Sequence, residues 1–259
     1  MRRLALSARH LGGRYRCPVC EHRVRRFEPL DAYCVENLRR HGYPHAFEES
    51  ETCNADCYRC PLCGASDRDR LYALYLRRHF RKFAGARPVK VIDFAPSPSL
   101  SRLVRALVAG SAPESSYRTA DLLMEGVDDR VDITEMNVYG DGSVDFFICS
   151  HVLEHVPDDR KALCELYRIL RPGGRGILVV PILLTAEEID EEPGLTDPAE
   201  RWRRFGQDDH VRMYSKQGFL SRVREAGFAV HQLGRGHFEG AFGRHGITDQ
   251  SVLYIAEKP

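Results

Sequence analysis

The sequence has no long apolar run and almost no excess of charge of either sign. Nowhere in its 259 residues does an apolar stretch approach the roughly 20 residues that a membrane-spanning helix needs. Lysine and arginine number 38, and aspartate and glutamate number 37, so the formal net charge is only +1. We therefore expect no membrane association, and the net charge does not indicate a nucleic acid as partner.

A recognisable secretory signal is also lacking. The N-terminus reads MRRLALSARH, which is basic, but its apolar run is too short for a signal peptide. The nine cysteines therefore indicate a reducing compartment, where clustered cysteines bind metal more often than they form disulfides. We expect a cytoplasmic protein. The sequence leaves the oligomeric state open, a homo-oligomer included.

What the sequence does contain falls into two regions. Seven cysteines lie between Cys17 and Cys63, within a segment (1–66) that has no long periodic element. Over residues 88–259, short β-branched runs alternate with helical patterns, which predicts an α/β fold with a parallel sheet and helices on both faces. Residues 67–87 carry apolar side chains at helical spacing, so we expect a connecting helix docked on that sheet.

Two matching Cys-x-x-Cys knuckles stand out in the first region. They supply the four thiolates of a tetrahedral zinc site, namely Cys17, Cys20, Cys60 and Cys63. Four thiolates leave no open position for a substrate, and a small segment poor in apolar residues needs a metal to fold. We therefore predict a zinc-ribbon-like module with a structural zinc ion.

The other three cysteines of this region leave alternatives open. Cys57 forms a further Cys-x-x-Cys pattern and can replace a knuckle ligand. A second site formed by Cys34, Cys53 and Cys57 with His41 or His45 is another alternative. We favour the interpretation that these three are ordinary reduced thiols.

The segment CSHVLEHVPDD, residues 149–159, contains the H-x-x-E-H pattern of an inverted zinc peptidase. Such a peptidase needs both histidines on one helix. Here the preceding SVDFFIC has the composition of a buried strand, and Pro157 signals the start of the next helix. His151 is therefore expected at the carboxyl end of a strand, where open α/β sheets bind small molecules. This context argues against a peptidase.

The stretch from Asp141 to Pro181, with its VLEHV and RILRPGG segments, resembles class I S-adenosylmethionine-dependent methyltransferases. The resemblance extends over about residues 88–259 and implies a Rossmann-like, mostly parallel, seven-stranded sheet. The segment RFGQDDHVRMY is similar to that of a branch with an F-G-Q-x-D-H-x-R-x-Y pattern and, often, cysteine knuckles before the catalytic domain. Members of that branch are commonly small-molecule or glycan-type methyltransferases.

The resemblance implies where S-adenosylmethionine binds. A carboxylate at the end of the second strand accepts the ribose hydroxyls, a second acceptor after the third strand binds the adenine amine, and residues after the fourth strand border the methionine portion. The residues at these positions are Asp121, Leu122, Asp132, Ile133, Thr134, Ser150 and His151.

The loop after the first strand departs from the family pattern. It reads VIDFAPSPSL, in which small residues replace the usual glycines and alternate with two prolines. Because proline fixes φ near −65°, we expect that the loop does not copy the usual glycine conformation. Small side chains still permit close approach, and the N–H groups of the following helix suit an anionic end of the cofactor. We therefore predict a variant cofactor site that includes Asp93, Phe94, Ala95 and Ser97.

Methyl transfer to a hydroxyl needs an aligned nucleophile and a proton acceptor. We consider His155 and His210 as the base, with Asp208 or Asp209 orienting His210. Arg212 and Tyr214 are expected to bind an acidic or sugar-like acceptor. The alternative is that Asp209, His210 and Arg212 form a buried polar network that holds a lid.

Three functions compete. The favoured one is methyl transfer from S-adenosylmethionine to a hydroxyl or amine of a small-molecule or glycan-type acceptor. The arginine-rich N-terminal stretch favours an RNA methyltransferase whose zinc module grips nucleic acid, but the near-neutral charge and the lack of an aromatic, basic stacking surface argue against it. The third is a catalytically inactive binding protein on the same fold.

Overall fold

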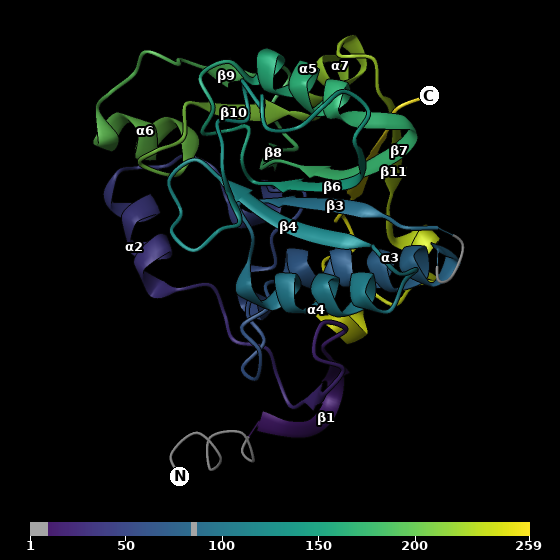
Figure 1. Cartoon of the computed structure of the whole chain (residues 1–259). Helices are drawn as coiled ribbons and strands as arrows, with labels where there is room; N and C mark the ends of the chain where they lie inside the picture. Colours follow the sequence, from purple (N-terminus) through teal and green to yellow (C-terminus); the bar gives the residue numbers. More distant parts are fainter. Residues whose placement is uncertain (1–9, 84–86) are drawn as a thin grey trace.

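A seven-stranded sheet runs through the centre of the molecule (Figure 1), which the computed structural model describes over residues 10–83 and 87–259. The strand order is β11-β12-β7-β6-β3-β4-β5. β12 is antiparallel to both of its neighbours, and the other neighbouring pairs are parallel. The strands are β3 (Lys90–Phe94), β4 (Ser116–Asp121), β5 (Asp129–Arg130), β6 (Val144–Ser150), β7 (Leu170–Val179), β11 (Ala229–Leu233) and β12 (Leu253–Glu257). The predicted Rossmann-like α/β fold is confirmed.

Helices cover both faces of this sheet (Figure 1). α3 (Asp67–Phe83) and α4 (Pro98–Ala109) lie on one face, and α5 (Asp159–Ile169) and α7 (Lys216–Glu225) lie on the other. Each of α4, α5 and α7 begins at a polar cap whose side chain accepts a hydrogen bond from the backbone N–H three residues later. The caps are Ser97, Asp158 and Ser215. α3 corresponds to the expected connecting helix, of which residues 84–86 lie outside the described residues.

The central strands are buried on both faces, which explains why their sequences are almost continuously apolar. In β6, Phe146 and Ile148 belong to the core beneath α3 and α4, whereas Phe147 and Cys149 belong to the core beneath α5 and α7. This alternation follows from the two-residue period of a strand. Gly176 of β7 gives the Phe147 ring its space, because a Cβ atom there would lie 2.3 Å from that ring.

Shorter elements lie before α3 and after β7. They are β1 (Leu11–Arg16), β2 (Arg23–Val24), α2 (Ala32–Arg40), η1 (Phe47–Glu49), η2 (Ala55–Cys57), β8 (Ile182–Leu183), β9 (Asp190–Glu191), α6 (Pro198–Phe205), β10 (Arg212–Ser215), η3 (Arg235–Phe238) and η4 (Gly243–His245). β10 pairs with β8 and β9 in a small second sheet beside the carboxyl end of the main one. None of the helices in the described ranges combines the length and the apolar character that crossing a bilayer requires.

The N-terminal module packs against α3 and the C-terminal segment. Arg70 of α3 is buried and donates hydrogen bonds to carbonyl oxygens of the module and of the C-terminal segment. These include the carbonyl oxygens of Tyr58 at 2.9 Å and of His245 at 2.6 Å. Its guanidinium also lies 3.8 Å from the centroid of the Phe27 ring. The module therefore shares a core with the sheet domain. Residues 1–9 of the predicted module lie outside the described residues.

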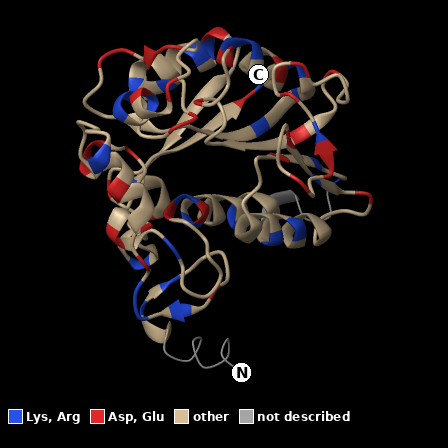
Figure 2. Ribbon diagram, turned by 90° about the vertical axis from the view of Figure 1, so that its left-hand side faces the viewer, with Lys and Arg blue, Asp and Glu red and all other residues tan. Residues whose placement is uncertain are grey.

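Charge is distributed unevenly between the module and the rest of the molecule. Figure 2 shows basic and acidic residues interspersed around the sheet and its helices, whereas the β1–β2 hairpin is mainly basic. The exposed arginines in and beside the hairpin are Arg14, Arg16, Arg23, Arg25 and Arg26. This is the arginine-rich stretch noted in the sequence.

Candidate active site

A cavity of about 630 Å³ opens at the carboxyl ends of β3, β4 and β6. This is the edge at which open α/β sheets bind their ligands. Most residues predicted to bind the cofactor line it, namely Phe94, Ala95, Asp121, Leu122, Asp132, Ile133, Thr134 and His151. The predicted residues Asp93, Ser97 and Ser150 do not line the cavity.

Asp121 has a structural role through one carboxylate oxygen, and its other carboxylate oxygen can accept hydrogen bonds from a ligand. Its Oδ1 accepts hydrogen bonds from the backbone N–H groups of Leu123 and Met124, each at 2.7 Å, and thereby closes the turn after β4. Its Oδ2 makes no hydrogen bond to a described residue, and the side chain faces the cavity. One carboxylate oxygen is thus held by the turn while the other can accept hydroxyl protons. Leu123 beside it leaves 75% of its surface exposed, although it is apolar.

Asp132 forms a similar turn after β5. Its Oδ1 accepts from the backbone N–H and from the hydroxyl of Thr134, both at 2.8 Å. Ile133 between them is buried. The carboxylates of Asp121 and Asp132 therefore follow adjacent parallel strands and face one cavity.

The β3–α4 loop adopts a conformation that the sequence argued against. Ala95 has a φ of +48°, in the left-handed region that glycine favours, although prolines flank the loop. The expectation that this loop does not copy a glycine conformation is therefore wrong at Ala95, because the residue ahead of Pro96, and not the proline, takes the unusual φ. Such a conformation costs about 1–2 kcal/mol in a residue with a Cβ atom.

Asp93 of β3 and Ser97 of the following loop do not line the cavity. Asp93 is 2% exposed and accepts a hydrogen bond from the Tyr117 hydroxyl at 2.6 Å; burial raises its pKa to about 7. Ser97 accepts from the N–H of Leu100 as the cap of α4 and donates to Asp69 of α3 at 3.0 Å. Both side chains are engaged in internal contacts, and their contact with the cofactor stays a prediction.

His151 stands at the end of β6, as expected, and the residues from there to Pro157 form turns and not a helix. The peptidase context is therefore absent. Its Nε2 lies 2.6 Å from Nη1 of Arg68, which can only donate, so Nε2 is the acceptor and Nδ1 carries the proton. Burial, with the nearby Arg68, lowers the pKa of His151 to about 4, and the ring is uncharged at neutral pH.

α3 contributes side chains that sequence reasoning missed. Arg68 contacts His151 and also donates to the hydroxyl of Tyr58 at 3.2 Å, and the Tyr72 hydroxyl lies 2.7 Å from Oγ of Ser150. The amphipathic pattern of residues 67–87 predicted only that a helix docks on the sheet. It did not show that the first turns of this helix reach the strand ends at the site.

His155 and Asp209 come together at the cavity wall. Nδ1 of His155 lies 3.2 Å from Oδ2 of Asp209, and both residues line the cavity. Burial opposes the charged imidazole, but the Asp209 carboxylate outweighs it and raises the pKa of His155; His155 in turn lowers the pKa of Asp209 to about 2. The sequence predicted that Asp209 orients His210, and the structure pairs it with His155 instead.

His210 and Glu154 lie behind this pair. His210 is buried, its ring centroid is 4.7 Å from that of His155, and its Nδ1 lies 3.1 Å from the Phe205 carbonyl oxygen. Glu154 is 0% exposed. Burial disfavours its charge, but His151 and the other nearby histidines lower its pKa to about 2, so the carboxylate is ionised at neutral pH.

Arg212 and Tyr214 do not reach the cavity. Arg212 is buried and donates to the carbonyls of Leu153 at 2.6 Å and Pro157 at 2.9 Å, which fixes the loop after β6. The Tyr214 hydroxyl donates to Asp159 at 2.5 Å. Neither side chain lines the cavity, so their contact with the acceptor stays a prediction. Arg212 lies in a buried polar network, but its partners are not Asp209 and His210, which the alternative interpretation had named.

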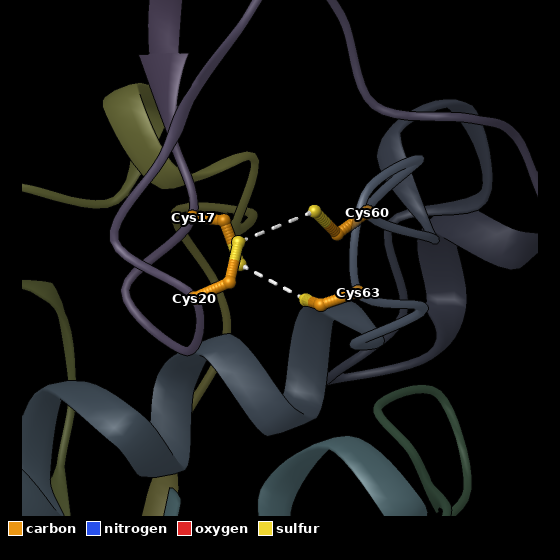
Figure 3. A group of neighbouring side chains, drawn as sticks. All are labelled: Cys17, Cys20, Cys60 and Cys63. Atoms are coloured by element: carbon orange, nitrogen blue, oxygen red, sulfur yellow. Dashed lines mark hydrogen bonds between the residues drawn. The ribbon is translucent and has the colours of Figure 1, made fainter. Parts of the chain in front are cut away.

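The four knuckle cysteines converge in the N-terminal module (Figure 3). The Sγ atoms of Cys17 and Cys63 are 3.7 Å apart, those of Cys20 and Cys60 are 4.0 Å apart, and all four lie within 4.8 Å of one another. A tetrahedron with zinc–sulfur bonds of about 2.3 Å has edges of roughly 3.8 Å. The donor set and its spacing therefore fit a zinc ion.

Both knuckles have the same backbone turn. The N–H of Glu21 donates to Cys17 O and that of Gly64 donates to Cys60 O, each at 2.8 Å, and both donors have a positive φ. The metal-capable groups among the described residues do not include Cys34, Cys53 or Cys57. The alternative in which Cys57 replaces a knuckle cysteine therefore does not match this geometry.

The comparisons with known proteins agree with the arrangement of the strands. Residues 85–178 match the family model described as a methyltransferase domain. This part of the chain is therefore a methyltransferase domain. No curated protein matches the sequence of the chain.

Solved structures resemble this chain at low sequence identity. The CMeT domain of the citrinin polyketide synthase is 13% identical, with a TM-score of 0.50 over 79% of this chain and 56% of that chain. The 1,6-didemethyltoxoflavin-N1-methyltransferase of Burkholderia thailandensis is 14% identical (TM-score 0.45; 74% of this chain, 78% of that chain). YcgJ of Bacillus subtilis is 16% identical (TM-score 0.42; 71% and 98%). At these identities the likeness concerns the fold alone.

Proposed function

We propose that the protein transfers a methyl group from S-adenosylmethionine to a hydroxyl or amine of a small-molecule or glycan-type acceptor. The observation that carries the proposal is the cavity itself. Two carboxylates, Asp121 and Asp132, face it from the ends of adjacent strands, and His151 and His155 face it from the segment after β6. When bound, S-adenosylmethionine supplies a methyl group already activated by its sulfonium.

Different residues bind different parts of the cofactor. Oδ2 of Asp121 accepts the ribose hydroxyls, and the apolar side chains of Leu122, Leu123 and Ile133 cover the adenine. The left-handed Ala95 lets the β3–α4 backbone approach the methionine portion closely. Burial of the exposed leucines against the base stabilises the complex by about 25 cal/mol per Å² of apolar surface removed from water.

The acceptor binds beside His155 and Asp209, because these are the members of the predicted catalytic set that line the cavity. With the cofactor bound, the acceptor's oxygen or nitrogen would attack the methyl carbon, the electron pair of the broken carbon–sulfur bond would stay on sulfur, and the acceptor would release its proton to water in the cavity. Alignment of the acceptor behind the methyl group can supply up to about 7–11 kcal/mol of the barrier reduction.

A structural zinc ion at the four cysteines completes the proposal. Its role is to fold the module, in which the carbonyl of the half-buried Cys63 accepts hydrogen bonds from Ser99 and Arg102 of α4. Four thiolates leave no coordination position for an acceptor. Zinc therefore stabilises the folded module and takes no part in the reaction.

Calorimetry with S-adenosylhomocysteine, the product of the cofactor, tests the proposal. The wild-type chain is expected to bind it, and Asp121→Asn is expected to weaken binding about 10–100-fold, as for the loss of a hydrogen bond to a charged group. Glu125→Gln, an exposed change directly after the Asp121 turn, serves as control. Absence of binding to the wild-type chain contradicts the proposal.

An RNA acceptor is the second candidate, favoured by the five exposed arginines in and beside the β1–β2 hairpin. If they bind phosphates, RNA affinity falls steeply with salt, by a slope set by the number of contacts. Replacing Arg23 and Arg25 by glutamine would then flatten that slope by about 2. Weak binding with no change between the two proteins leaves the small-molecule acceptor as the proposal.

A further inference from the structure

A second group of metal-binding side chains lies next to the cavity. Glu154, His155 and His210 each offer a ligand atom, and these atoms lie within 4.8 Å of one another. The residues come from two segments, which are joined where the N–H of Val211 donates to the Glu154 carbonyl at 2.9 Å. The group is therefore built by the fold, because 55 residues of chain separate His155 from His210.

In both histidines, Nδ1 contacts a neighbouring oxygen, and Nε2 is left to bind an ion. Nδ1 of His155 contacts the Asp209 carboxylate at 3.2 Å, and Nδ1 of His210 contacts the Phe205 carbonyl at 3.1 Å. A carbonyl only accepts, so Nδ1 of His210 carries the proton and Nε2 holds a lone pair. Metal-binding histidines show this pattern: one nitrogen binds the ion, and the other donates to a carboxylate or a carbonyl.

Glu154 is an independent observation that points to a cation. The side chain is 0% exposed, and Oε2 has no hydrogen-bond partner among the described residues. Oε1 lies 3.1 Å from Nδ1 of His151, whose other ring nitrogen contacts Arg68. The charge of a buried carboxylate needs compensation, and bound cations are one of the ways in which proteins supply it.

We propose that Glu154, His155 and His210 bind a divalent transition-metal ion, such as zinc, that is separate from the four-cysteine site. Two imidazoles and one carboxylate form a ligand set used for zinc and other first-row metals in sites with an open position. Because His155 and Asp209 line the cavity, the open position faces the acceptor. The acceptor class is then a molecule that offers the ion an oxygen, such as an enol, a phenol or a vicinal diol.

The role of the ion in methyl transfer rests on the proposed function, whereas its binding does not. A hydroxyl bound to the ion has a lowered pKa and releases its proton to water in the cavity. Its oxygen then forms the bond to the methyl carbon, and the electrons of the broken carbon–sulfur bond remain on sulfur as a thioether. His155 acts as a ligand and not as the base, because the ion uses its lone pair.

Cobalt titration of the metal-free full-length chain tests the site directly. Cobalt bound by four thiolates gives intense sulfur-to-metal absorption, whereas cobalt bound by nitrogen and oxygen gives weak bands without it. We expect two equivalents in the wild-type chain, one of each kind. Glu154→Gln and His210→Gln should lose only the nitrogen and oxygen site, and Asp209→Asn should weaken it about 10–100-fold.

Two controls separate this result from other causes. His231→Gln, a histidine on the far edge of the sheet that contacts Glu257, should keep both equivalents. Cys60→Ser should lose the thiolate bands only. One equivalent in the wild-type chain, or a second equivalent that survives in both Glu154→Gln and His210→Gln, overturns the proposal. Binding of S-adenosylhomocysteine to the same samples reports on the proposed function separately, since Asp121 and Asp132 take no part in the ion site.

Discussion

The four-cysteine cluster and the Glu154–His155–His210 cluster differ in both construction and surroundings. The cysteines come from two local knuckles with the same turn, lie in the module and offer a closed set of four thiolates. The second cluster has three ligands, joins segments that are distant in the sequence and borders the cavity. A closed set suits folding, and an open set suits chemistry. An ion of the same type would therefore stabilise the fold at the four-cysteine cluster and take part in the reaction at the Glu154–His155–His210 cluster.

Loss of a knuckle cysteine is expected to have the largest effect. Structural zinc contributes about 10–16 kcal/mol of binding free energy in small zinc domains. Cys60→Ser should therefore release zinc and unfold the module, seen as loss of metal and as rapid proteolysis before residue 67. Cys34→Ser, outside the cluster, should retain the metal. A Cys60→Ser protein with full zinc content and wild-type resistance to proteolysis would refute a structural role.

Asp93 and Glu154 are both buried carboxyl groups, and a pH experiment tests the first of them. Burial raises the pKa of Asp93 from 3.8 to about 7, so the native state keeps a proton that the unfolded chain has released. The free energy of unfolding therefore falls as pH rises from about 4 to about 7, by up to roughly 4 kcal/mol. Asp93→Asn, which keeps an acceptor for Tyr117, should escape this loss. Urea denaturation of both proteins at pH 5 and pH 8 measures it; equal losses in the two proteins count against the buried, protonated Asp93.

Replacing Glu154 should have a smaller effect than replacing Cys60. The nearby histidines hold the pKa of Glu154 at about 2, below its ordinary 4.5, so its charge stabilises the native state at neutral pH. In the ion-free protein, Glu154→Gln should therefore lower the free energy of unfolding, by up to roughly 3 kcal/mol. Added zinc or cobalt should stabilise the wild-type chain further and leave the variant unchanged. Thermal unfolding with and without the ion is the measurement, and equal stabilisation of both proteins by the ion would contradict the Glu154 site.

The smallest effect is expected at the cofactor loop. Ala95→Gly relieves a left-handed backbone in a residue with a Cβ atom, worth about 1 kcal/mol, although the freer unfolded chain offsets part of this. The variant should therefore match or slightly exceed the wild type in stability and keep its affinity for S-adenosylhomocysteine. Ser101→Gly, on the helix that follows, should destabilise by a similar amount. A clear loss of stability in Ala95→Gly would contradict the strained loop.

The parts of the fold that depend on local patterns could be predicted. Strand ends can be located in the sequence, and parallel strands bring their ends to one edge. The family resemblance implies that Asp121 and Asp132 at these ends bind the cofactor, and both residues line the cavity. The knuckles are equally local, because Cys-x-x-Cys brings two thiolates onto one turn. These predictions needed no knowledge of which helix lies over which strand.

What could not be predicted depends on distant packing. The pairing of His155 with Asp209, the approach of Arg68 to His151 and the burial of Arg212 require the relative positions of separate segments. The conformation of Ala95 could not be predicted for a different reason. Each proline restricts its own φ, whereas the left-handed φ is found at Ala95, the residue before Pro96, where no sequence rule requires it.

A crystal structure of the full chain with S-adenosylhomocysteine, recorded at the zinc absorption edge, tests the central claim most directly. The account predicts the ribose hydroxyls on Asp121, the adenine between Leu122 and Ile133, and an anomalous peak between Cys17, Cys20, Cys60 and Cys63. A nucleoside bound elsewhere, or a cavity that stays empty at saturating ligand, would contradict it.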